Sequence, residues 1–461
     1  MKKKRIGIFI DHDLLIRHFL VKNKFKMLEK KFDVKYFFSN NKRRISVNLN
    51  QFKINHKATV KIDLVRRYKI NKLSLVARLV MANKKKNKSF RKASLKETYG
   101  YINSRTTIII YSFFALKFIY PFFNWFLRKF LIGYNFYLEN IIKKNKLDMI
   151  IHPTVLNGDF ASDLIEIGNK NNIPTLYLMN SWDNCSSRAL THGHPTKYLV
   201  WGQQAKKFAK ESLNLKDKNL GIIGCAQFEI YNDKPLMSKR DFRKLYNLKK
   251  NEKLLCYAGS NLGVDETKHL MLLDNEIKKN KKNFKVLYRP HPWKIKHPNE
   301  KSFFKYNFKN ILFEKYSLKN YRDSFSNYRK SKSSIIDADY RHTNTIIKSI
   351  DGAFVPFSTF AIECSIQGLP TGLYYPSNKN EYSNKFQIKT DFFQFLIKIL
   401  KPKICYGEEN LYKTFLNLKE KSNDYLNRKI IKKRVKKLVR IKKKNDYSKN
   451  LLFFCNKVLK I

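Results

Sequence analysis

Two loops in the C-terminal half carry residue types that bind or transfer phosphate groups. The first, 289–292 (Arg-Pro-His-Pro), follows an apolar stretch at 284–288, and Ser358 and Thr359 follow a second apolar stretch at 352–356. Both stretches are typical of strands, and open parallel sheets bind ligands at the carboxyl ends of their strands. The pattern predicts a site for a nucleotide with phosphates, and therefore a transferase.

The second loop has the composition of a helix start. Ser358 stands where an N-cap belongs, and a helix N-terminus attracts phosphate through its free N–H groups and partial positive charge. Glu363 follows Thr359 by one turn, on the same face, where its carboxylate can accept hydrogen bonds from the vicinal hydroxyls of a ribose. Gly368 is expected to end this helix. An ordinary Ser-capped helix is the alternative.

The first loop holds an imidazole beside a guanidinium. Prolines on both sides stiffen the backbone around His291, which, with Arg289, can donate to a phosphate or take part in proton transfer. Gly259 and Ser260 follow a third expected strand at 253–258, and such a small-residue turn lets backbone N–H groups approach a phosphate. Simple turns remain the alternative at both places.

In the N-terminal half, three polar residues at expected strand ends are candidates for catalysis. Asp11 and His12 follow the strand expected at 5–10, and Asp183 follows the one at 174–179. An Asp or His at such a position can be the general base that deprotonates an acceptor hydroxyl. His152 and Trp182 lie at similar positions. Helix capping by the aspartates and a core position for Trp182 are the alternatives.

The elements that position these residues alternate between strand and helix, which predicts an α/β fold of doubly wound units. The usual dinucleotide glycine fingerprint is absent, so neither a nicotinamide nor a flavin cofactor is expected, and no cofactor is assigned. Strands are expected at 5–10, 34–38, 148–151, 174–179, 198–202, 220–224, 253–258, 284–288, 352–356 and 371–375, with helices at 14–30, 159–171, from 203, and at 360–367.

Length and composition fit a globular chain of more than one domain. At 461 residues, with 43% hydrophobic residues, the chain can bury two or three cores. Its six cysteines are dispersed without metal-type spacing, which suits a reducing cytoplasm. The apolar stretch at 6–10 is too short for a signal peptide, so a cytoplasmic location is expected, with attachment to the inner face of the membrane as an option.

The net charge of +59 raises the question of nucleic-acid binding. Lys, Asn, Ile, Phe and Tyr are all abundant, and AT-rich codons encode all of them, so a genome-wide bias accounts for much of the lysine. The lysines are scattered and no nucleic-acid motif is present, so nucleic acid is not expected as a partner. The charge favours weak attraction to anionic lipid surfaces and anionic substrates.

Two segments raise the question of membrane contact. Residues 107–127 are apolar with nine aromatics, and this segment can be a buried helix, an interfacial helix or a spanning one. Residues 427–444 are basic with an apolar helical stripe, either packed with a solvated basic face or lying on a membrane. The stripe comprises Ile430, Ile431, Val435, Leu438 and Val439.

The two C-terminal loops together resemble those of GT-B glycosyltransferases of bacterial surface-polysaccharide synthesis. The chain is most similar to the CDP-glycerol glycerophosphotransferase and capsule or lipopolysaccharide transferase group. There, a His-Pro motif and a later Ser/Thr-Glu helix hold the donor nucleotide, and the matching positions are 291–292, Ser358, Thr359 and Glu363. In the C-terminal half the resemblance rests on sequence motifs. In the N-terminal half it rests only on the expected architecture.

The resemblance implies two Rossmann-like domains facing a cleft, with a C-terminal helix that crosses back. Residues 1–235 would bind the acceptor, 236–400 the nucleotide donor, and 401–461 would form a basic helical segment. The expected partners are a nucleotide-activated donor and a polysaccharide or lipid-linked acceptor, with a membrane surface as a further option.

The reaction implied is metal-independent transfer to a hydroxyl, with Arg289, His291 and the helix start at 358–359 stabilising the leaving group. The letter matches to Asp-x-Asp at 11–13 and 337–339 are not read as metal sites. A non-hydrolysing sugar-nucleotide 2-epimerase and a non-catalytic polysaccharide assembly or export protein of the same fold are the alternatives.

Overall fold

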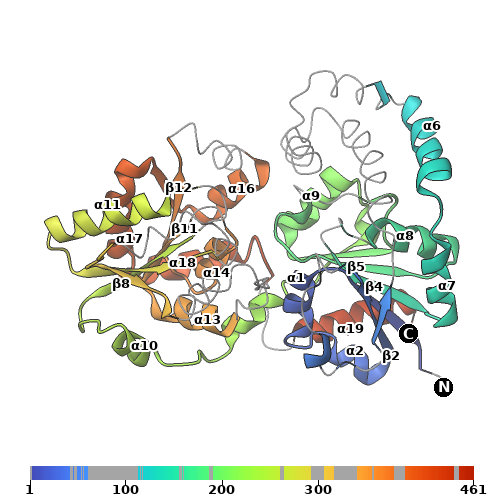
Figure 1. Ribbon diagram of the computed structural model, residues 1–461, viewed down its shortest axis with the longest axis horizontal. Helices are drawn as coiled ribbons and strands as arrows, with labels where there is room; N and C mark the ends of the chain where they lie inside the picture. Colours follow the sequence, from blue (N-terminus) through green and yellow to red (C-terminus); the bar gives the residue numbers. More distant parts are fainter. Residues whose placement is uncertain are drawn as a thin grey trace. The chain divides into compact units, whose positions relative to one another are not determined.

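The chain divides into two compact units, each built around one parallel sheet (Figure 1). Unit 1 comprises Met1–Glu229 with Leu438–Ile461, and unit 2 comprises Ile230–Lys437. The computed structural model describes residues 3–41, 45, 49–52, 54, 57–60, 113–114, 116, 118–154, 158, 160–185, 191–259, 264–291, 306–315, 340–355, 358–377, 390–440 and 446–460.

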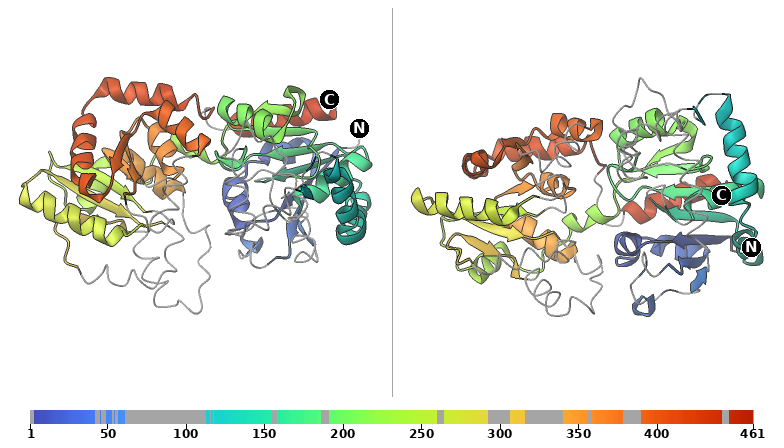
Figure 2. Two further views of the ribbon diagram at one scale, coloured as in Figure 1. Left: turned by 90° about the horizontal axis from the view of Figure 1, so that it is seen from above. Right: turned by 45° about the horizontal axis from the view of Figure 1, so that its top comes forward.

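The sheet of unit 1 has seven parallel strands in the order β3-β2-β1-β4-β5-β6-β7. Its central strands are almost entirely buried, as expected for a parallel sheet covered by helices on both faces (Figure 2). The strands are β1 (Arg5–Ile10), β2 (Asp33–Ser39), β3 (Lys57–Val60), β4 (Met149–Pro153), β5 (Thr175–Leu178), β6 (Lys197–Val200) and β7 (Leu220–Ile222).

The helices of unit 1 include one that the sequence predicted as continuous. The expected helix at 14–30 is divided into α1, the π-helix η1 and α2, because Asn23 takes a φ of 34° and breaks the chain of helical turns. The described helices are α1 (Asp13–Leu15), η1 (Ile16–Leu20), α2 (Lys26–Lys31), η2 (Leu49–Gln51), α6 (Ile119–Phe126), η3 (Leu127–Ile132), α7 (Phe136–Lys144), α8 (Ala161–Lys170), α9 (Gln203–Leu213), η5 (Asp217–Asn219) and α19 (Asp446–Leu459).

The last helix, α19, returns the chain to unit 1, as the crossing helix of the expected fold does. A buried network holds it there: Lys24 pairs with Glu229, and the Tyr447 N–H donates to Glu229 Oε1 over 2.7 Å. Ser448 Oγ donates to the carbonyl of Lys24 over 2.9 Å. Both charged groups are therefore paired and hydrogen-bonded, the condition under which charges can be buried.

The sheet of unit 2 has six parallel strands in the order β10-β9-β8-β11-β12-β13. One of its faces forms a core with the apolar side chains of α11 and α17. Helices α13 and α14 lie on the other side (Figure 1). The strands are β8 (Lys253–Ala258), β9 (Phe284–Arg289), β10 (Ile311–Phe313), β11 (Gly352–Val355), β12 (Thr371–Tyr375) and β13 (Lys403–Tyr406).

The helices of unit 2 include the basic helix predicted near the C-terminus. On α18, Ile431 and Val435 are buried as expected, but Ile430 is 46% exposed, so the predicted apolar stripe is wrong at that position. The helices are α10 (Lys239–Leu245), α11 (Glu266–Lys279), α13 (Tyr340–Ser349), α14 (Phe360–Ile366), α16 (Asp391–Leu400), η11 (Glu408–Asn410), α17 (Leu411–Lys421) and α18 (Tyr425–Val435), with η6 (Gln227–Asn232) at the junction of the units.

Of the aromatic segment predicted at 107–127, the structure describes residues 113–114, 116 and 118–127, and the part from Ile119 forms α6 and the start of η3. Within the described parts of the chain, no helix has both the length and the apolar character needed to cross a membrane.

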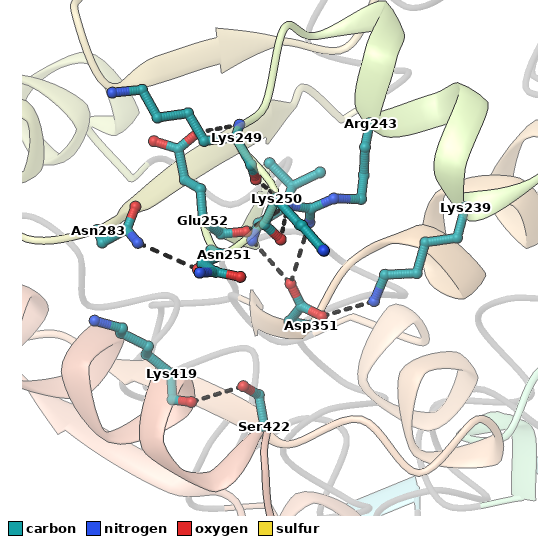
Figure 3. Close-up of polar contacts among 11 residues, drawn as sticks. Lys239, Arg243, Lys249, Lys250, Asn251, Glu252, Asn283, Asp351, Lys419 and Ser422 are labelled. Atoms are coloured by element: carbon teal, nitrogen blue, oxygen red, sulfur yellow. Dashed lines mark hydrogen bonds and ion pairs between the residues drawn. The ribbon is translucent and has the colours of Figure 1, made fainter.

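Asp351 joins three elements at the amino ends of β8 and β11 in unit 2 (Figure 3). Its carboxylate accepts from the Leu254 N–H over 2.9 Å and from Lys239 Nζ over 2.7 Å, and Arg243 Nη1 lies 4.0 Å away. Arg243 also donates to the Glu252 carbonyl over 2.7 Å. The buried carboxylate thus fixes α10 to the edge of the sheet.

Replacing Asp351 with Ala should lower the free energy of unfolding by about 2–3 kcal/mol, because the buried Leu254 N–H and the Lys239 ammonium lose their acceptor and Arg243 loses a nearby negative charge. Urea-induced unfolding followed by circular dichroism measures the change. The control is Glu408→Ala, which removes a more exposed ion pair with Lys268 and should have little effect. Equal stability of both variants would contradict the role of Asp351.

Candidate active site

The carboxyl ends of β8 and β9 are brought into contact in unit 2. The Gly259 N–H donates to the carbonyl of Arg289 over 2.8 Å. A Cβ atom at Gly259 would lie only 2.8 Å from the backbone nitrogen of His291 and 3.1 Å from Cα of Pro290. Glycine is therefore needed here, and it lets the loop that carries His291 lie directly against the end of β8.

Arg289 connects this loop to the start of α14. Its guanidinium carbon lies 4.9 Å from the centre of the Phe360 ring, and Nη2 donates to Thr343 Oγ1 over 3.1 Å. Phe360 is the first residue of α14, so the cation–π contact holds the positive charge of Arg289 close to a helix N-terminus. Thr343, on α13, was not predicted from the sequence.

Ser358 and Thr359 form the start of α14. Ser358 Oγ accepts from the Phe360 N–H over 3.1 Å, and the carbonyl of Thr359 accepts from the Glu363 N–H over 3.1 Å. Thr359 is the capping position of the helix and makes no capping bond with its side chain. Ser358 is thus the residue whose hydroxyl satisfies a free N–H group at this end.

Glu363 is buried, and its carboxylate faces the hydroxyl of Tyr231. Burial, and next the negative charge of Glu363, raise the pKa of Tyr231 well above its ordinary value. Gln367 Nε2 on the same helix donates to the Tyr231 carbonyl over 3.0 Å. Tyr231 therefore fixes the side of α14 on which Glu363 lies, a contact that the sequence did not predict.

Glu363 and Arg289 shift the pKa of the Cys364 thiol in opposite directions. Burial raises the pKa of Cys364 well above its ordinary value, Glu363 adds to this rise, and the charge of Arg289 opposes it. Both charged groups therefore lie within electrostatic range of one position on α14. The arrangement places a cation and an anion at the helix that was predicted to hold a nucleotide.

Two further carboxylates border these strand ends and were missed by sequence reasoning. Glu266 on α11 is buried and accepts from the Tyr288 hydroxyl over 2.6 Å, and its Oε2 lies 2.8 Å from the Cβ position of Gly259. Glu314 follows β10, and its N–H donates to the Tyr288 carbonyl over 3.0 Å. Glu314 follows β10, a strand that was not predicted, so its position at a strand end was not recognised.

In unit 1, the carboxyl ends of β1 and β4 bring Asp11 and His152 together. Both are buried, with Asp11 Oδ2 at 3.9 Å from His152 Nε2. His152 Nδ1 lies 2.8 Å from the Phe9 carbonyl, which can only accept, so Nδ1 carries a proton and Nε2 faces the carboxylate. The carboxylate can therefore stabilise a positive charge on this imidazole.

His12 caps α1, which limits the chemistry it can do. Its Nδ1 accepts from the Leu14 N–H over 3.0 Å, so the neutral ring carries its proton on Nε2. In this geometry His12 can donate a hydrogen bond, but its Nδ1 lone pair is occupied. The carboxylates predicted nearby are better suited to accept a proton.

Asp183 lies in a loop that is shaped by its own polar side chains. Asn184 Oδ1 accepts from the N–H groups of Asn180 and Ser181 over 3.1 and 2.9 Å. Ser181 Oγ donates to Asp183 Oδ1 over 2.5 Å. Asp183 is half-buried, whereas Trp182 is buried, in agreement with the core alternative for the tryptophan.

His18, on the π-helix η1, is a buried residue of this region that sequence reasoning did not single out. Burial, with the charges of Arg17 and His12, lowers its pKa well below the ordinary value, and a hydrogen bond with the Asn180 backbone acts in the opposite direction. His18 thus lies between α1 and the loop after β5. A π-helix often marks a functional site, but the pattern of apolar residues in the sequence did not predict that η1 is a π-helix.

Not every predicted residue can be placed. Ser260, Pro292 and the 337–339 Asp-x-Asp match lie outside the described residues. Among the described residues, no group of three or more His, Cys, Asp and Glu side chains is arranged to hold a metal ion.

No protein-family model and no curated protein sequence matches this chain. Solved structures do match over its whole length. A Listeria monocytogenes protein described as a UDP-N-acetylglucosamine 2-epimerase is 10% identical, with a TM-score of 0.53 over 100% of this chain and 98% of its own. S. aureus MnaA, solved with UDP, is 10% identical, with a TM-score of 0.50 over 99% and 97%.

A glycosyltransferase from Rickettsia africae is 12% identical, with a TM-score of 0.48 over 100% of both chains. At these identities the likeness concerns the fold. Together with the two parallel sheets, the likeness to the Listeria and S. aureus structures confirms the α/β fold of the GT-B type that the sequence resemblance implied.

His18 should make unit 1 sensitive to acid. Because its folded pKa lies well below 6.5, the unfolded chain binds a proton that the folded chain does not, and stability falls as the pH drops below about 6.5. Urea unfolding at a series of pH values between about 7.5 and 5 measures this loss. In His18→Gln the loss should be smaller, and an identical pH dependence in both proteins would contradict the prediction.

Proposed function

We propose that this protein is a metal-independent glycosyltransferase, or a related glycerophosphotransferase, that uses a nucleotide-activated donor. The observation that carries the proposal is the position of Arg289, held by Phe360 and Thr343 at the start of α14. Next to it, the Gly259 contact fixes the loop of His291. Arg289 thus lies at the helix start, and His291 follows it by two residues in the loop against the end of β8. A guanidinium and an imidazole in such positions are suited to stabilise phosphate oxygens.

In this proposal unit 2 binds the donor. The backbone near Gly259 and the start of α14 at Ser358 and Thr359 receive its phosphates, and Glu363 accepts hydrogen bonds from the ribose hydroxyls. The UDP in the S. aureus MnaA structure supports a nucleotide ligand for a protein of this fold.

Unit 1 binds the acceptor. The hydroxyl oxygen of the acceptor attacks the donor carbon, or the donor phosphorus when a glycerophosphate is transferred. The bond between that atom and the leaving phosphate breaks. Asp11 or Asp183 takes the hydroxyl proton, while His12 donates a hydrogen bond. Arg289 and His291 stabilise the negative charge that develops on the leaving oxygen. These side chains supply the positive charge that a metal ion would otherwise provide.

The acceptor we propose is a cell-surface polysaccharide or a lipid-linked precursor, as the group resemblance of the two loops implies. We place the reaction in the cytoplasm. All six cysteines are free and buried, which fits a reducing compartment.

Two alternatives remain within this fold. The Listeria and S. aureus structures favour a sugar-nucleotide 2-epimerase as the second candidate. Product analysis separates them, because transfer releases the nucleotide when an acceptor is present, whereas epimerisation gives an isomeric nucleotide sugar without any acceptor. A non-catalytic assembly or export protein would bind no nucleotide sugar, which thermal-shift screening detects.

Replacing His291 with Ala should reduce turnover by about 100-fold or more and change donor affinity much less, because the interaction strengthens in the transition state. Donor binding by calorimetry and nucleotide release at saturating donor measure the two effects separately. His342→Ala, on α13, is the control for loss of an imidazole elsewhere in unit 2. Normal turnover in His291→Ala would remove the assigned role.

Replacing Glu363 with Ala should weaken donor binding by about 1–3 kcal/mol, the range for a lost charged hydrogen bond. Glu363→Gln, which retains the size and the contact with Tyr231, separates this loss from a change in packing. Ser365→Ala is the control on the same helix, because the Ser365 hydroxyl donates only within α14, to the Ala361 carbonyl. Calorimetry with UDP and CDP conjugates measures all three, and wild-type affinity in Glu363→Ala would refute the assignment.

A further inference from the structure

Helix α6 and the π-helix η3 carry a series of exposed aromatic side chains in unit 1. No residue of α6 is buried. Phe118, which precedes α6, is 89% exposed, and Phe130 on η3 is 59% exposed. We name this set the aromatic face; its members are Phe118, Phe122, Trp125, Phe126, Phe130 and Leu131.

Four side chains of the aromatic face, Phe122, Trp125, Phe126 and Phe130, are joined by ring contacts into one patch. The ring centres of Phe122 and Trp125 are 5.6 Å apart, those of Trp125 and Phe130 5.6 Å, and those of Phe126 and Phe130 5.2 Å. Contiguous apolar patches of this kind mark interaction sites, whereas isolated surface aromatics do not.

The opposite side of the same helix faces the protein. Tyr120, Asn124 and Arg128 are spaced four residues apart and line a hollow against α8, where Arg128 pairs with Glu166. Phe118 and Phe122 have the same spacing on a different side of the helix. The helix is therefore attached to unit 1 by its polar side, and its aromatic side is directed away from α8.

One basic residue, Lys129, contacts the aromatic face, and the sequence around it is basic. Lys129 Nζ lies 5.0 Å from the Trp125 ring centre and 5.5 Å from that of Phe130. Between 118 and 146 the chain has five basic residues and one acidic residue, Glu139, which is buried. The basic residues are Arg128, Lys129, Lys143, Lys144 and Lys146.

We propose that the aromatic face docks on a bilayer that contains anionic lipids, with its rings inserted at the level of the headgroups. Trp and Phe on one side and Lys at the boundary are the composition of interfacial helices. The net charge of +59 favours an anionic lipid surface and opposes contact between two copies of the chain. This inference does not rest on the proposed transferase activity.

Trp125 is a native reporter for the test. The other described tryptophans, Trp182 and Trp201, are buried. With vesicles of phosphatidylcholine and phosphatidylglycerol, the full-length protein should sediment, its emission should shift to the blue, and brominated acyl chains should quench it. Trp125→Phe should still bind, but most of the quenching should be lost. Vesicles of phosphatidylcholine alone should bind much more weakly.

The variant Phe122→Ser with Phe130→Ser should lower vesicle affinity by about tenfold or more, since transferring one aromatic side chain from water to an apolar phase accounts for a factor of this size. The matched control is Tyr425→Ser with Leu426→Ser, which removes two exposed apolar side chains from α18 and should bind like wild type. Circular dichroism verifies that both variants are folded.

Three outcomes would overturn the proposal. Equal binding of the Phe122/Phe130 variant and wild type would show attachment by charge alone, and loss of binding only in the Tyr425/Leu426 variant would assign docking to α18. Absence of vesicle binding, with a dimer in sedimentation that the Phe122/Phe130 variant abolishes, would make the aromatic face a contact between copies. Absence of binding with a monomer would show that another segment of this chain covers it.

Discussion

The arrangement of this protein depends on one constraint, the burial of two parallel sheets on both faces. A strand in such a sheet has no polar side, so β1 and β8 consist of nearly continuous apolar residues. Polar side chains can then be concentrated only where a strand ends. The carboxyl ends of β1, β4 and β5 in unit 1, and of β8, β9 and β11 in unit 2, carry almost all candidates for chemistry.

Charged residues have different roles at the two ends of the sheet in unit 2. At the amino end, the Asp351 carboxylate is fully engaged by a backbone N–H, a lysine and an arginine, and its role is to hold α10 in place. At the carboxyl end, Arg289 has an aromatic ring and one hydroxyl as its described partners. A guanidinium has five donors, so capacity remains for phosphate oxygens.

Unit 1 combines a buried polar cluster with an exposed apolar surface. The charges that are buried there, such as Lys24 with Glu229, are paired and fix the returning helix α19. The aromatic side chains of α6 are instead directed to solvent by a helix whose polar side binds α8. If the aromatic face binds a membrane, a lipid-linked acceptor would reach unit 1 at the surface on which such acceptors reside.

The sequence by itself determined the strands, the order of the elements and the strand-end residues. The strand at 5–10 and the strand at 253–258 have the predicted bounds, because a buried parallel strand is recognisable from its apolar composition alone. The strands β3, β10 and β13 were not predicted. Each has only two or three apolar residues between lysines and other polar residues, a pattern that loops also show.

Only the tertiary structure decided which partners surround the predicted residues. Thr343 lies 54 positions from Arg289, and Gln367 lies 136 positions from Tyr231, and no local pattern encodes such contacts. Lys24, next to the Asn23 turn that divides the helix expected at 14–30, likewise pairs with a glutamate 205 positions away. Residue types and strand ends are local properties of a sequence, whereas the neighbours of a side chain depend on the packing of segments that are distant along the chain.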